Sequence, residues 1–339
     1  MAKEQDATST LTQPSDASQL IIRDLPGNQR ISSHSARRYK KSLGNSIWRA
    51  RWAYLLILPG AAYFLVFYYL PLLGNVVAFQ DYSPYLGFFR SAWVGLDNFT
   101  SLLTDPEFFI SVRNTLVISV LQIIFAFPLG LVLALMLNAI ISVRFKRTMQ
   151  SIVYLPHFMG WVIIASIWRE IFGGDGFVNH LITGLGGKPV DLITNPVLFQ
   201  PMMVLQVIWK ESGWSTVMFL AALSMIDVNL YEAAVVDGAN KWRRMWHITL
   251  PGLRTIIALL LILRLGSVLS VGFEQIFLQQ QGVNSSVSQV IDTFVYSRGI
   301  VNGQWGIATA AGLIKAVVGV VLIYLSNFIA KKLGGEGLF

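Results

Sequence analysis

The sequence predicts an all-α integral membrane protein that crosses the bilayer six times. Of its 339 residues, 54% are hydrophobic and 13% are charged, and the mean hydropathy is +0.57. A membrane-spanning helix needs roughly 20 mostly apolar residues. Six stretches meet that requirement, at 52–73, 112–138, 149–171, 199–226, 250–277 and 305–329. There is no cysteine, which excludes disulfides, thiolate metal sites and a cysteine nucleophile.

The region before the first span changes from polar to basic. Residues 1–41 are expected to form a disordered cytoplasmic tail. The first twenty residues lack the basic start and apolar stretch of a secretory signal, so the first span is expected to lead the chain into the membrane. Residues 42–52 place apolar side chains at helical spacing among cations. That pattern fits either a helix lying along the inner membrane surface or a solvated basic linker.

Cations are distributed unevenly between the two sides of the predicted membrane. If the N-terminus is cytoplasmic, so are the connections 139–148 and 227–249 and the C-terminal segment 330–339. Those three carry Arg144, Lys146, Arg147, Lys241, Arg243, Arg244, Lys331 and Lys332, whereas the outer connections hold Arg90, Lys188 and Arg298, with Arg113 at a border. The excess of cations on cytoplasmic loops predicts that both termini are cytoplasmic. The net charge of +8 then needs no nucleic-acid partner, because topology and anionic inner-leaflet lipid account for it.

The long inner connection 227–249 is predicted to form two short helices hinged at a glycine. Asp227 and Asn240 are suited to cap the two helix N-termini, and Gly238 is suited to the left-handed conformation that ends the first helix. The second helix has an apolar edge formed by Trp242, Met245 and Trp246. Such an element is shaped to dock against another protein.

The spacing within this connection resembles a known signature. Glu-Ala-Ala, three residues, Gly, nine residues and Ile-x-Leu-Pro together resemble the coupling loop of permease subunits in type I binding-protein-dependent ABC importers, and every fixed position of the signature is met. The signature residues and their neighbours in the expected docking site are Glu232, Ala233, Ala234, Asp237, Gly238, Trp242, Ile248, Leu250 and Pro251. The resemblance extends over nearly all of 50–339, including the segments 93–116, 219–239 and 272–299, and is greatest to the carbohydrate branch, especially permeases for oligosaccharides or polysaccharide fragments of the alginate type.

The resemblance implies a division of labour among several subunits. It implies the type I importer permease fold, with 52–111 as first helix and outer segment and 112–339 as permease core containing the loop 227–249. It also implies that the helix bearing Glu232 sits in a cleft of a separate ATPase, where ATP and Mg bind. The expected partners are two such ATPases, an extracytoplasmic solute-binding protein and a second, homologous permease in a heterodimer, with a homodimer as the alternative. The expected location is the bacterial cytoplasmic (inner) membrane.

Polar side chains inside apolar spans mark the expected translocation path, because a charge facing lipid at mid-membrane costs at least about 2.5–3.5 kcal/mol. In the fifth span, polar residues at spacings of three and four are predicted to line one helical face over about 15 Å. The fourth span adds a polar interruption with two tryptophans. The resulting candidates are Trp209, Lys210, Trp214, Arg264, Ser267, Ser270 and Glu274, with Gln275 bordering them. The alternative interpretation is internal ion pairing that only holds helices together.

The outer segment 74–111 is long and aromatic. Tyr82, Tyr85, Phe88, Phe89 and Trp93 fit either a surface met by the binding protein or a lid packed on the spans. The sequence does not separate these two alternatives.

Several functions are excluded by missing motifs. No G-x-x-x-x-G-K-[ST] loop occurs, so ATP binding by that route is not expected in this chain. The histidines at 34, 157, 180 and 247 show no metal-ligand spacing, and no nucleophile and base pair can be argued from spacing, so neither a metal site nor an enzyme is expected. Two alternatives remain, an ABC importer permease for another solute class and a secondary transporter; no internal repeat supports the second.

Overall fold

The computed structural model describes residues 51–332 of the chain. The chain divides into two units, 1–65 and 66–339, which are described separately. The predicted tail 1–41, most of the segment 42–52 and the C-terminal end from 333 lie outside the described residues.

The described part of the first unit is a single apolar helix. Helix α2 (Arg51–Phe64) contains Pro59, and all of its side chains are exposed. A π-helical turn, η1 (Leu65–Tyr69), follows across the boundary between the units. Together with α3 (Leu70–Leu72) and the 3₁₀ segment η2 (Leu73–Phe79), it continues a 29-residue helical stretch, Arg51–Phe79, that is long and apolar enough to cross a membrane.

The second unit is almost entirely helical. Near its start, a two-stranded antiparallel sheet forms, in which β1 (Gln80–Asp81) pairs with β2 (Ala92–Trp93) around α4 (Gly87–Arg90). The elements that follow are α5 (Asp97–Thr104), α6 (Pro106–Leu121), η3 (Gln122–Ala126), α7 (Phe127–Ala139), α8 (Val143–Tyr154), η4 (Leu155–Phe158), α9 (Trp161–Phe172), α10 (Phe177–Gly184), α11 (Phe199–Leu223), α12 (Val228–Val236), α13 (Lys241–Arg244), η5 (Met245–Thr249), α14 (Leu250–Gly266), α15 (Phe273–Gln279), α16 (Ser285–Ser288), α17 (Ile291–Tyr296), η6 (Ser297–Val301) and α18 (Trp305–Lys332).

The helices provide four to six candidate membrane spans. Four continuous stretches are long and apolar enough, at Arg51–Phe79, Pro106–Ala139, Lys241–Gly266 and Trp305–Lys332. Two bent pairs bring the number to six if each pair is one span: Val143–Phe158 with Trp161–Gly184, bent by 103°, and Phe199–Leu223 with Val228–Val236, bent by 72°. The prediction of an all-helical membrane protein is confirmed, and each predicted span overlaps one of these stretches.

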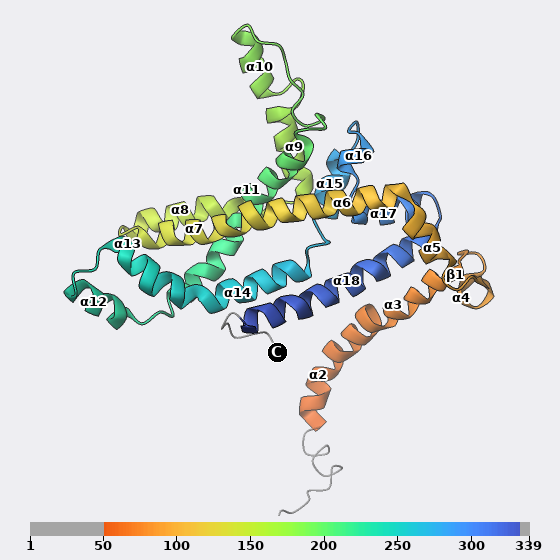
Figure 1. Ribbon diagram of the computed structural model, residues 1–339, viewed down its shortest axis with the longest axis horizontal. Coiled ribbons are helices and arrows are strands. Elements are labelled where there is room, and N and C mark those ends of the chain that lie inside the picture. The colour runs from red at the N-terminus through yellow and green to blue at the C-terminus, as the bar shows by residue number, and fades with distance from the viewer. Residues whose placement is uncertain (1–50, 333–339) are drawn as a thin grey trace, which may run out of the picture. The chain divides into compact units, whose positions relative to one another are not determined.

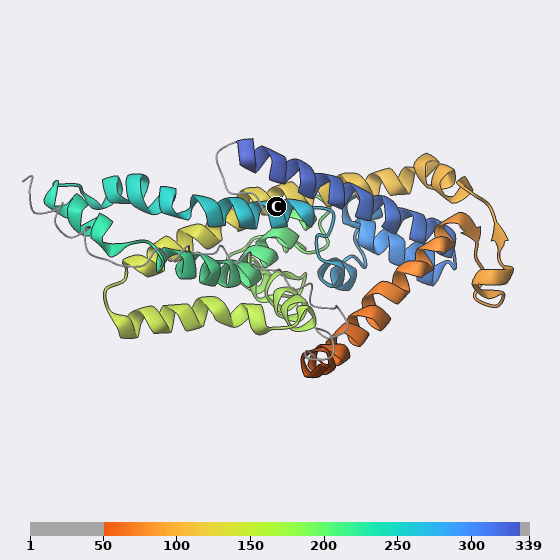
Figure 2. The same cartoon turned by 90° about the horizontal axis from the view of Figure 1, so that it is seen from below.

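Within the second unit, α6, α7, α14 and α18 run alongside one another (Figure 1). Helices α12 and α13 lie at one end of this bundle, and α4, α5 and the small sheet lie at the other, as the two views agree (Figures 1 and 2). The loop 227–249 and the outer segment 74–111 are therefore separated by the length of the bundle.

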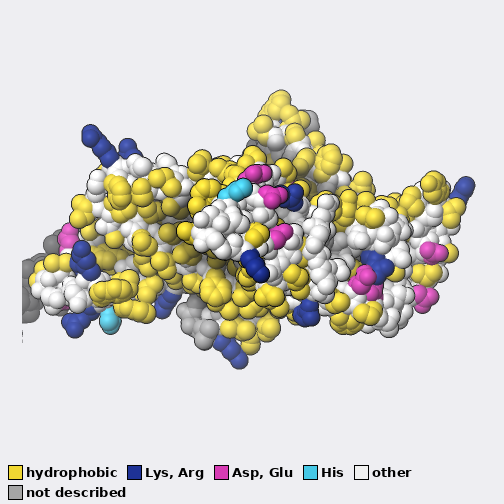
Figure 3. Space-filling model, turned by 90° about the horizontal axis from the view of Figure 1, so that it is seen from above, with side chains coloured by type: hydrophobic (Ala, Val, Ile, Leu, Met, Phe, Trp, Pro, Cys, Tyr) yellow, Lys and Arg dark blue, Asp and Glu magenta, His cyan; other side chains and the backbone are white. Residues whose placement is uncertain are grey.

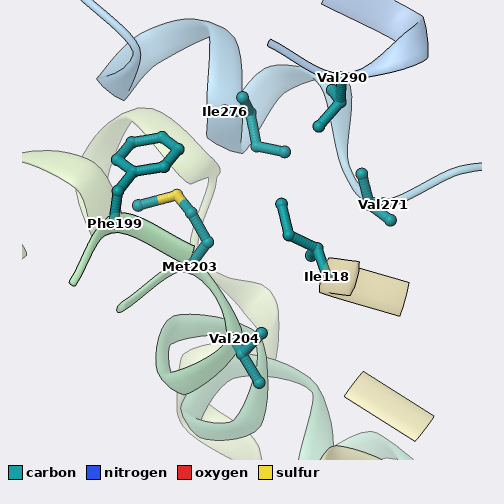
Figure 4. Close-up of a cluster of buried hydrophobic side chains, with 7 residues drawn as sticks. All are labelled: Ile118, Phe199, Met203, Val204, Val271, Ile276 and Val290. Atoms are coloured by element: carbon teal, nitrogen blue, oxygen red, sulfur yellow. The ribbon is translucent and has the colours of Figure 1, made fainter. Parts of the chain in front are cut away.

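Three clusters of buried side chains hold the second unit together. The first joins α6, α11, α15 and the segments beside them, and is formed by Ile118, Phe199, Met203, Val204, Val271, Ile276 and Val290 (Figure 4). The second lies near the outer segment, around Phe108 and Phe294. The third joins α7, α11 and α14 through Ala134, Phe219, Leu223 and Leu253. Outside these clusters apolar side chains predominate on the surface, as expected for contact with lipid or with another subunit (Figure 3).

Two predicted spans are broken instead of continuous. The expected polar face along 250–277 does not lie on one helix, because α14 ends at Gly266 and α15 begins only at Phe273. Gly272, in this break, has a positive φ of 104°, a backbone conformation that glycine adopts more readily than other residues. The third predicted span, 149–171, is interrupted between Phe158 and Trp161 by the 103° bend. Hydropathy detects apolar length but does not detect such breaks.

Proline explains where several helices loosen. Each of the π-helical turns η1, η3 and η5 ends two positions before a proline, namely Pro71, Pro128 and Pro251. Proline has no N–H to donate to the preceding turn, so one α-helical hydrogen bond is missing there in any case. The backbone can therefore adopt the wider π-helical pattern without losing a further hydrogen bond. The helix from Lys241 to Gly266 is therefore continuous through Pro251.

Candidate functional site

The loop 227–249 folds through hydrogen bonds between near neighbours. The Asp227 side chain accepts from the Asn229 amide at 2.9 Å, which caps α12, and the Asn240 side chain accepts from the Arg243 amide at 2.8 Å, which caps α13. At the end of α12, the Gly238 amide donates to Val235 and the Ala239 amide donates to Ala234. These two bonds form a Schellman motif, with Gly238 at φ 76°. The predicted caps and glycine hinge are confirmed.

The loop presents its side chains to the outside of the described chain. None of the α12 residues is buried; Glu232 and Ala233 are exposed and Ala234 is half-buried. Asp237 and Gly238 are exposed at the hinge, and Trp242 is 69% exposed. Of the remaining predicted docking residues, Ile248 and Leu250 are half-buried and Pro251 is exposed. A short helix with small side chains and no buried face is suited to insertion into a groove of a partner.

Two contacts hold the ends of the loop together where it meets the helical bundle. The Tyr231 hydroxyl lies 3.0 Å from the hydroxyl of Thr249, so α12 is joined to η5. Just beyond η5, Gly252 packs against Ile226, and a Cβ placed there would lie 2.8 Å from the Ile226 side chain. Leu253 is fully buried in the cluster that joins α7, α11 and α14. The loop therefore continues directly into the cluster that joins three helices.

Polar side chains from four elements converge around Glu211 in the middle of α11. We call Gln122, His157, Lys210, Glu211, Trp214 and Arg264 the Glu211 cluster. Glu211 lies 2.9 Å from His157 Nδ1, and His157 stacks on Trp214 with ring centroids 4.7 Å apart. Lys210 is only 7% exposed and donates to the carbonyls of His157 (2.8 Å) and Met159 (2.6 Å). Two backbone acceptors released by the break at 159–160 thus hold the buried ammonium.

A cavity of about 200 Å³ adjoins the cluster between η3, α7, α11 and α14. Glu211, Arg264, Gln122, Ser212 and Ser215 contribute its polar lining. The Arg264 guanidinium donates to the Gln122 side-chain oxygen, and Gln122 Nε2 is buried without a partner among the described residues. The cavity therefore offers a carboxylate, a guanidinium, hydroxyls and an amide donor within an apolar bundle.

The remaining predicted pathway residues lie elsewhere. Trp209 is half-exposed and meets Trp168 edge to face, with ring centroids 6.4 Å apart. Ser267 and Ser270 are exposed in the break after α14, and the Ser267 hydroxyl donates to carbonyls of its own helix. Glu274 is exposed on α15. The structure brings Lys210, Trp214 and Arg264 together around Glu211 and leaves these four outside the cluster.

Gln275 is not at a cavity wall. It is fully buried and donates to Met203 and to Gln206, which in turn exchanges hydrogen bonds with Gln279. These three glutamines join α11 to α15.

Sequence reasoning missed four polar groups that the structure makes prominent. Glu211 was not among the candidate pathway residues, although Lys210 beside it was. Gln122 lies in an otherwise apolar span. His157, which shows no metal-ligand spacing in the sequence, pairs with Glu211. Lys315, in the last span, pairs with Asp292. An intramembrane ionisable residue is itself the signal that identifies Glu211 and Lys315. The pairing of His157 has no such signal.

A second polar cavity, of about 580 Å³, is lined by the α9–α10 loop and the segment after α15. Glu170, Asp175, Asp191 and Gln281 contribute to its lining. Burial raises the pKa of Asp191, but hydrogen bonds from the Thr194 hydroxyl and from the amides of Thr194 and Ile193 outweigh burial, so the pKa is lowered. Asp191 is therefore a charged group at neutral pH.

The outer segment exposes most of its aromatic side chains. Tyr82 and Phe88 pack on each other, with ring centroids 5.3 Å apart. Tyr85 and Phe89 are almost fully exposed, and Trp93 is 67% exposed. These three rings are not packed on the described spans.

Comparison with known proteins defines the class of the molecule. Residues 126–335, more than half of the chain, match the family described as the binding-protein-dependent transport system inner membrane component. The chain belongs to this family. It is a multi-pass membrane permease of a binding-protein-dependent ABC importer and is not itself an enzyme; ATP binding belongs to the ATPase partner. The family resemblance seen in the sequence is confirmed, and the alternative of a secondary transporter is excluded.

Individual relatives are similar over most of their length. Protein LplB of Bacillus subtilis (strain 168) is 50% identical over 86% of this chain and 92% of the relative. The polygalacturonan/rhamnogalacturonan transport system permease protein YteP of the same organism is 45% identical over 88% and 94%. A crystal structure of a bacterial alginate ABC transporter in complex with an alginate pentasaccharide-bound periplasmic protein includes a chain that is 36% identical, with a TM-score of 0.80, over 87% of this chain and 99% of that one.

Proposed function

We propose that this permease forms half of the membrane pathway of an importer for oligosaccharides or polysaccharide fragments, delivered by a solute-binding protein. The observation that carries the proposal is the polar cavity beside the Glu211 cluster, set among apolar helices. The similarity to a permease named for polygalacturonan and rhamnogalacturonan and to an alginate transporter supports the same substrate class.

The chemistry of the cavity suits a sugar that carries hydroxyl and carboxylate groups. Sugar hydroxyls donate to Glu211 and accept from Arg264 and from the unpartnered Gln122 Nε2. A guanidinium matches a carboxylate in two-pronged geometry, so Arg264 is the group we assign to a uronate. Half-exposed Trp209 and Trp214 add aromatic faces for sugar rings. Ser267, Ser270 and Glu274 remain proposed contacts further along the pathway, with Gln275 as a support behind them.

A ligand screen tests the substrate class. The assembled importer with its binding protein, in lipid nanodiscs, is expected to hydrolyse ATP faster with oligogalacturonides or alginate oligosaccharides than with no ligand. Neutral maltooligosaccharides of equal length provide the comparison for charge. Stimulation by amino acids or metal ions, with none by any glycan, would reject the carbohydrate assignment and leave an importer for another solute class.

We also propose how the chain assembles with its partners. A second, non-identical permease completes the pathway, and two ATPases bind from the cytoplasm, one of them at α12. The exposed Glu232 and Ala233 and the small, half-buried Ala234 support docking in an ATPase groove. The exposed rings of Tyr85, Phe89 and Trp93 support a surface for the binding protein at the other end.

The proposed topology places both termini and the loop 227–249 in the cytoplasm. In this proposal, residues 1–41 form the tail, 42–52 an interfacial helix or a basic linker, 52–111 the first helix and outer segment, and 112–339 the core. Because the chain has no cysteine, one introduced cysteine reports one position. In intact cells, an impermeant thiol reagent is expected to label Tyr85→Cys and not Asn229→Cys. The reverse pattern would invert the topology.

A further inference from the structure

A cavity of about 470 Å³ lies between the loop 227–249 and the end of α7, away from the Glu211 cluster. Its lining comes from the end of α7, from α12, from α13 and from η5. The polar groups include Asn138, Tyr231, Lys241, Arg244 and Thr249, and Leu135 and Met245 provide apolar walls. None of the cavity-lining residues is a carboxylate.

The two cations face the cavity without a counter-charge. Lys241 and Arg244 are three positions apart on α13, so their side chains share one face of the helix. Neither makes an ion pair among the described residues. Arg244 Nε is buried and has no hydrogen-bond partner among residues 51–332. A buried donor left unpaired costs free energy, so an acceptor from beyond the described residues would complete the site.

The position of the cavity indicates where that acceptor comes from. The candidate span Pro106–Ala139 ends at the cavity, and the candidate span Lys241–Gly266 begins there. The ends of spans lie at the depth of the lipid head groups. Two cations, an amide and a hydroxyl above apolar walls match a phosphate joined to a glycerol and acyl chains, and basic pockets between membrane helices bind anionic head groups.

We propose that this cavity binds the head group of an anionic phospholipid of the inner leaflet, with the phosphate on Lys241 and Arg244. The inference rests on the proposed cytoplasmic placement of the loop. The Tyr231–Thr249 hydrogen bond borders the cavity. A bound lipid therefore connects α12 and α13 to α7 and stiffens the link between the ATPase and the bundle.

Native mass spectrometry of the assembled importer tests the site. The complex is delipidated in detergent and titrated with phosphatidylglycerol or with phosphatidylcholine. Wild type is expected to retain phosphatidylglycerol at least tenfold more tightly than the Arg244→Gln variant, with no such difference for phosphatidylcholine. Lys241→Gln is a second variant with the same expectation, in case Arg244→Gln does not assemble.

Arg243→Gln is the matched control, because it removes one cation from the same short helix at a position that does not line the cavity. It is expected to bind phosphatidylglycerol as wild type does. Equal losses in Arg243→Gln and in the cavity variants would mean general surface attraction and would overturn the proposal. Full displacement of the lipid by millimolar inorganic phosphate would also overturn it, in favour of a site for soluble phosphate.

The readout separates this proposal from the proposed function. Lipid retention needs no transported solute, so a wrong sugar assignment leaves the Arg244 and Arg243 comparison intact. Thiol labelling at position 229 decides the orientation independently. The effect on coupling is then measured in nanodiscs, where phosphatidylglycerol is expected to raise ligand-stimulated ATP hydrolysis in wild type and not in Arg244→Gln.

Discussion

The coupling loop (residues 227–249) makes its capping hydrogen bonds between residues two to three positions apart, whereas the Glu211 cluster joins residues that lie far apart in the sequence. The loop is mostly exposed, whereas Gln122 and Lys210 of the cluster are buried and His157, Glu211 and Arg264 are half-buried. A loop whose hydrogen bonds join near neighbours can keep its conformation while it moves as a rigid body. A cluster built from long-range contacts exists only when the bundle is folded. Substitutions in the loop should therefore affect coupling, and those in the cluster should affect folding as well.

Replacing Gly238 by proline should give the largest effect on function. Proline fixes φ near −65°, whereas Gly238 has a φ of 76°, and the Schellman hydrogen bond from its amide is lost too. We expect ligand-stimulated ATP hydrolysis to fall at least tenfold, while the permease stays in the membrane at wild-type levels. The measurement is ATPase activity of the reconstituted importer with and without loaded binding protein.

Gly238→Asn is the matched control for that substitution. Asparagine tolerates the left-handed conformation better than other residues with a side chain. It should retain most of the stimulation. Normal stimulation in the proline variant would show that the hinge does not transmit force.

Gly213→Ala tests how closely α11 and α8 approach behind the cluster. A Cβ at Gly213 would lie 2.1 Å from the Val153 carbonyl oxygen, which is far inside van der Waals contact. Overpacking of this kind costs about 1–3 kcal/mol or more, so the melting temperature and the membrane level should both fall. Gly312→Ala, where a Cβ meets nothing within 4 Å, should leave the melting temperature unchanged. Equal stability of the two variants would mean that the helices separate readily.

Lys210→Met should lower stability in a way that a loop substitution does not. The change leaves the His157 and Met159 carbonyls without their donor in a mostly buried position. Each unpaired group costs about 1–3 kcal/mol. Thermal unfolding of the purified permease is the measurement, with Glu232→Lys as the loop counterpart. Glu232→Lys should uncouple hydrolysis without moving the melting temperature, and a shared effect of both variants would remove the distinction between the regions.

The smallest expected effect is local fraying of α12 in the Asp227→Ala variant. The substitution removes the cap on the Asn229 amide and costs about 1 kcal/mol. Hydrogen exchange in α12 should become roughly fivefold faster, because local opening follows local free energy. Exchange in α11 and α14 should not change. If exchange accelerates throughout the bundle, the loop is not an independent unit.

The same contrast explains what was predictable from the sequence. Apolar length predicted the spans, and the caps at Asp227 and Asn240 and the hinge at Gly238 were predicted because each depends on residues next to it. The continuous polar face from Arg264 to Glu274 was a wrong prediction, since periodicity does not detect the break that ends α14 at Gly266.

The sequence does not predict which polar side chains pair with each other inside the bundle. Nothing near His157 indicates that Glu211 is its partner, and nothing near Gln122 indicates Arg264, because these pairs depend on how distant helices pack. The roles of Trp209, Ser267, Ser270 and Glu274 in substrate contact stay predictions.

We expect the continuous helix from Lys241 to Gly266 to transmit movement of the loop as a rigid rod. Its 26 residues are about 39 Å long at about 1.5 Å per residue, so a tilt of about 5° at the loop swings the far end by about 3 Å. Arg264 sits near that far end, and a swing of this size exceeds what its hydrogen bond to Gln122 can follow. A small movement of the loop, driven by the ATPase, is therefore expected to break the Arg264–Gln122 hydrogen bond and open the cavity. Every turn of the helix would stay folded.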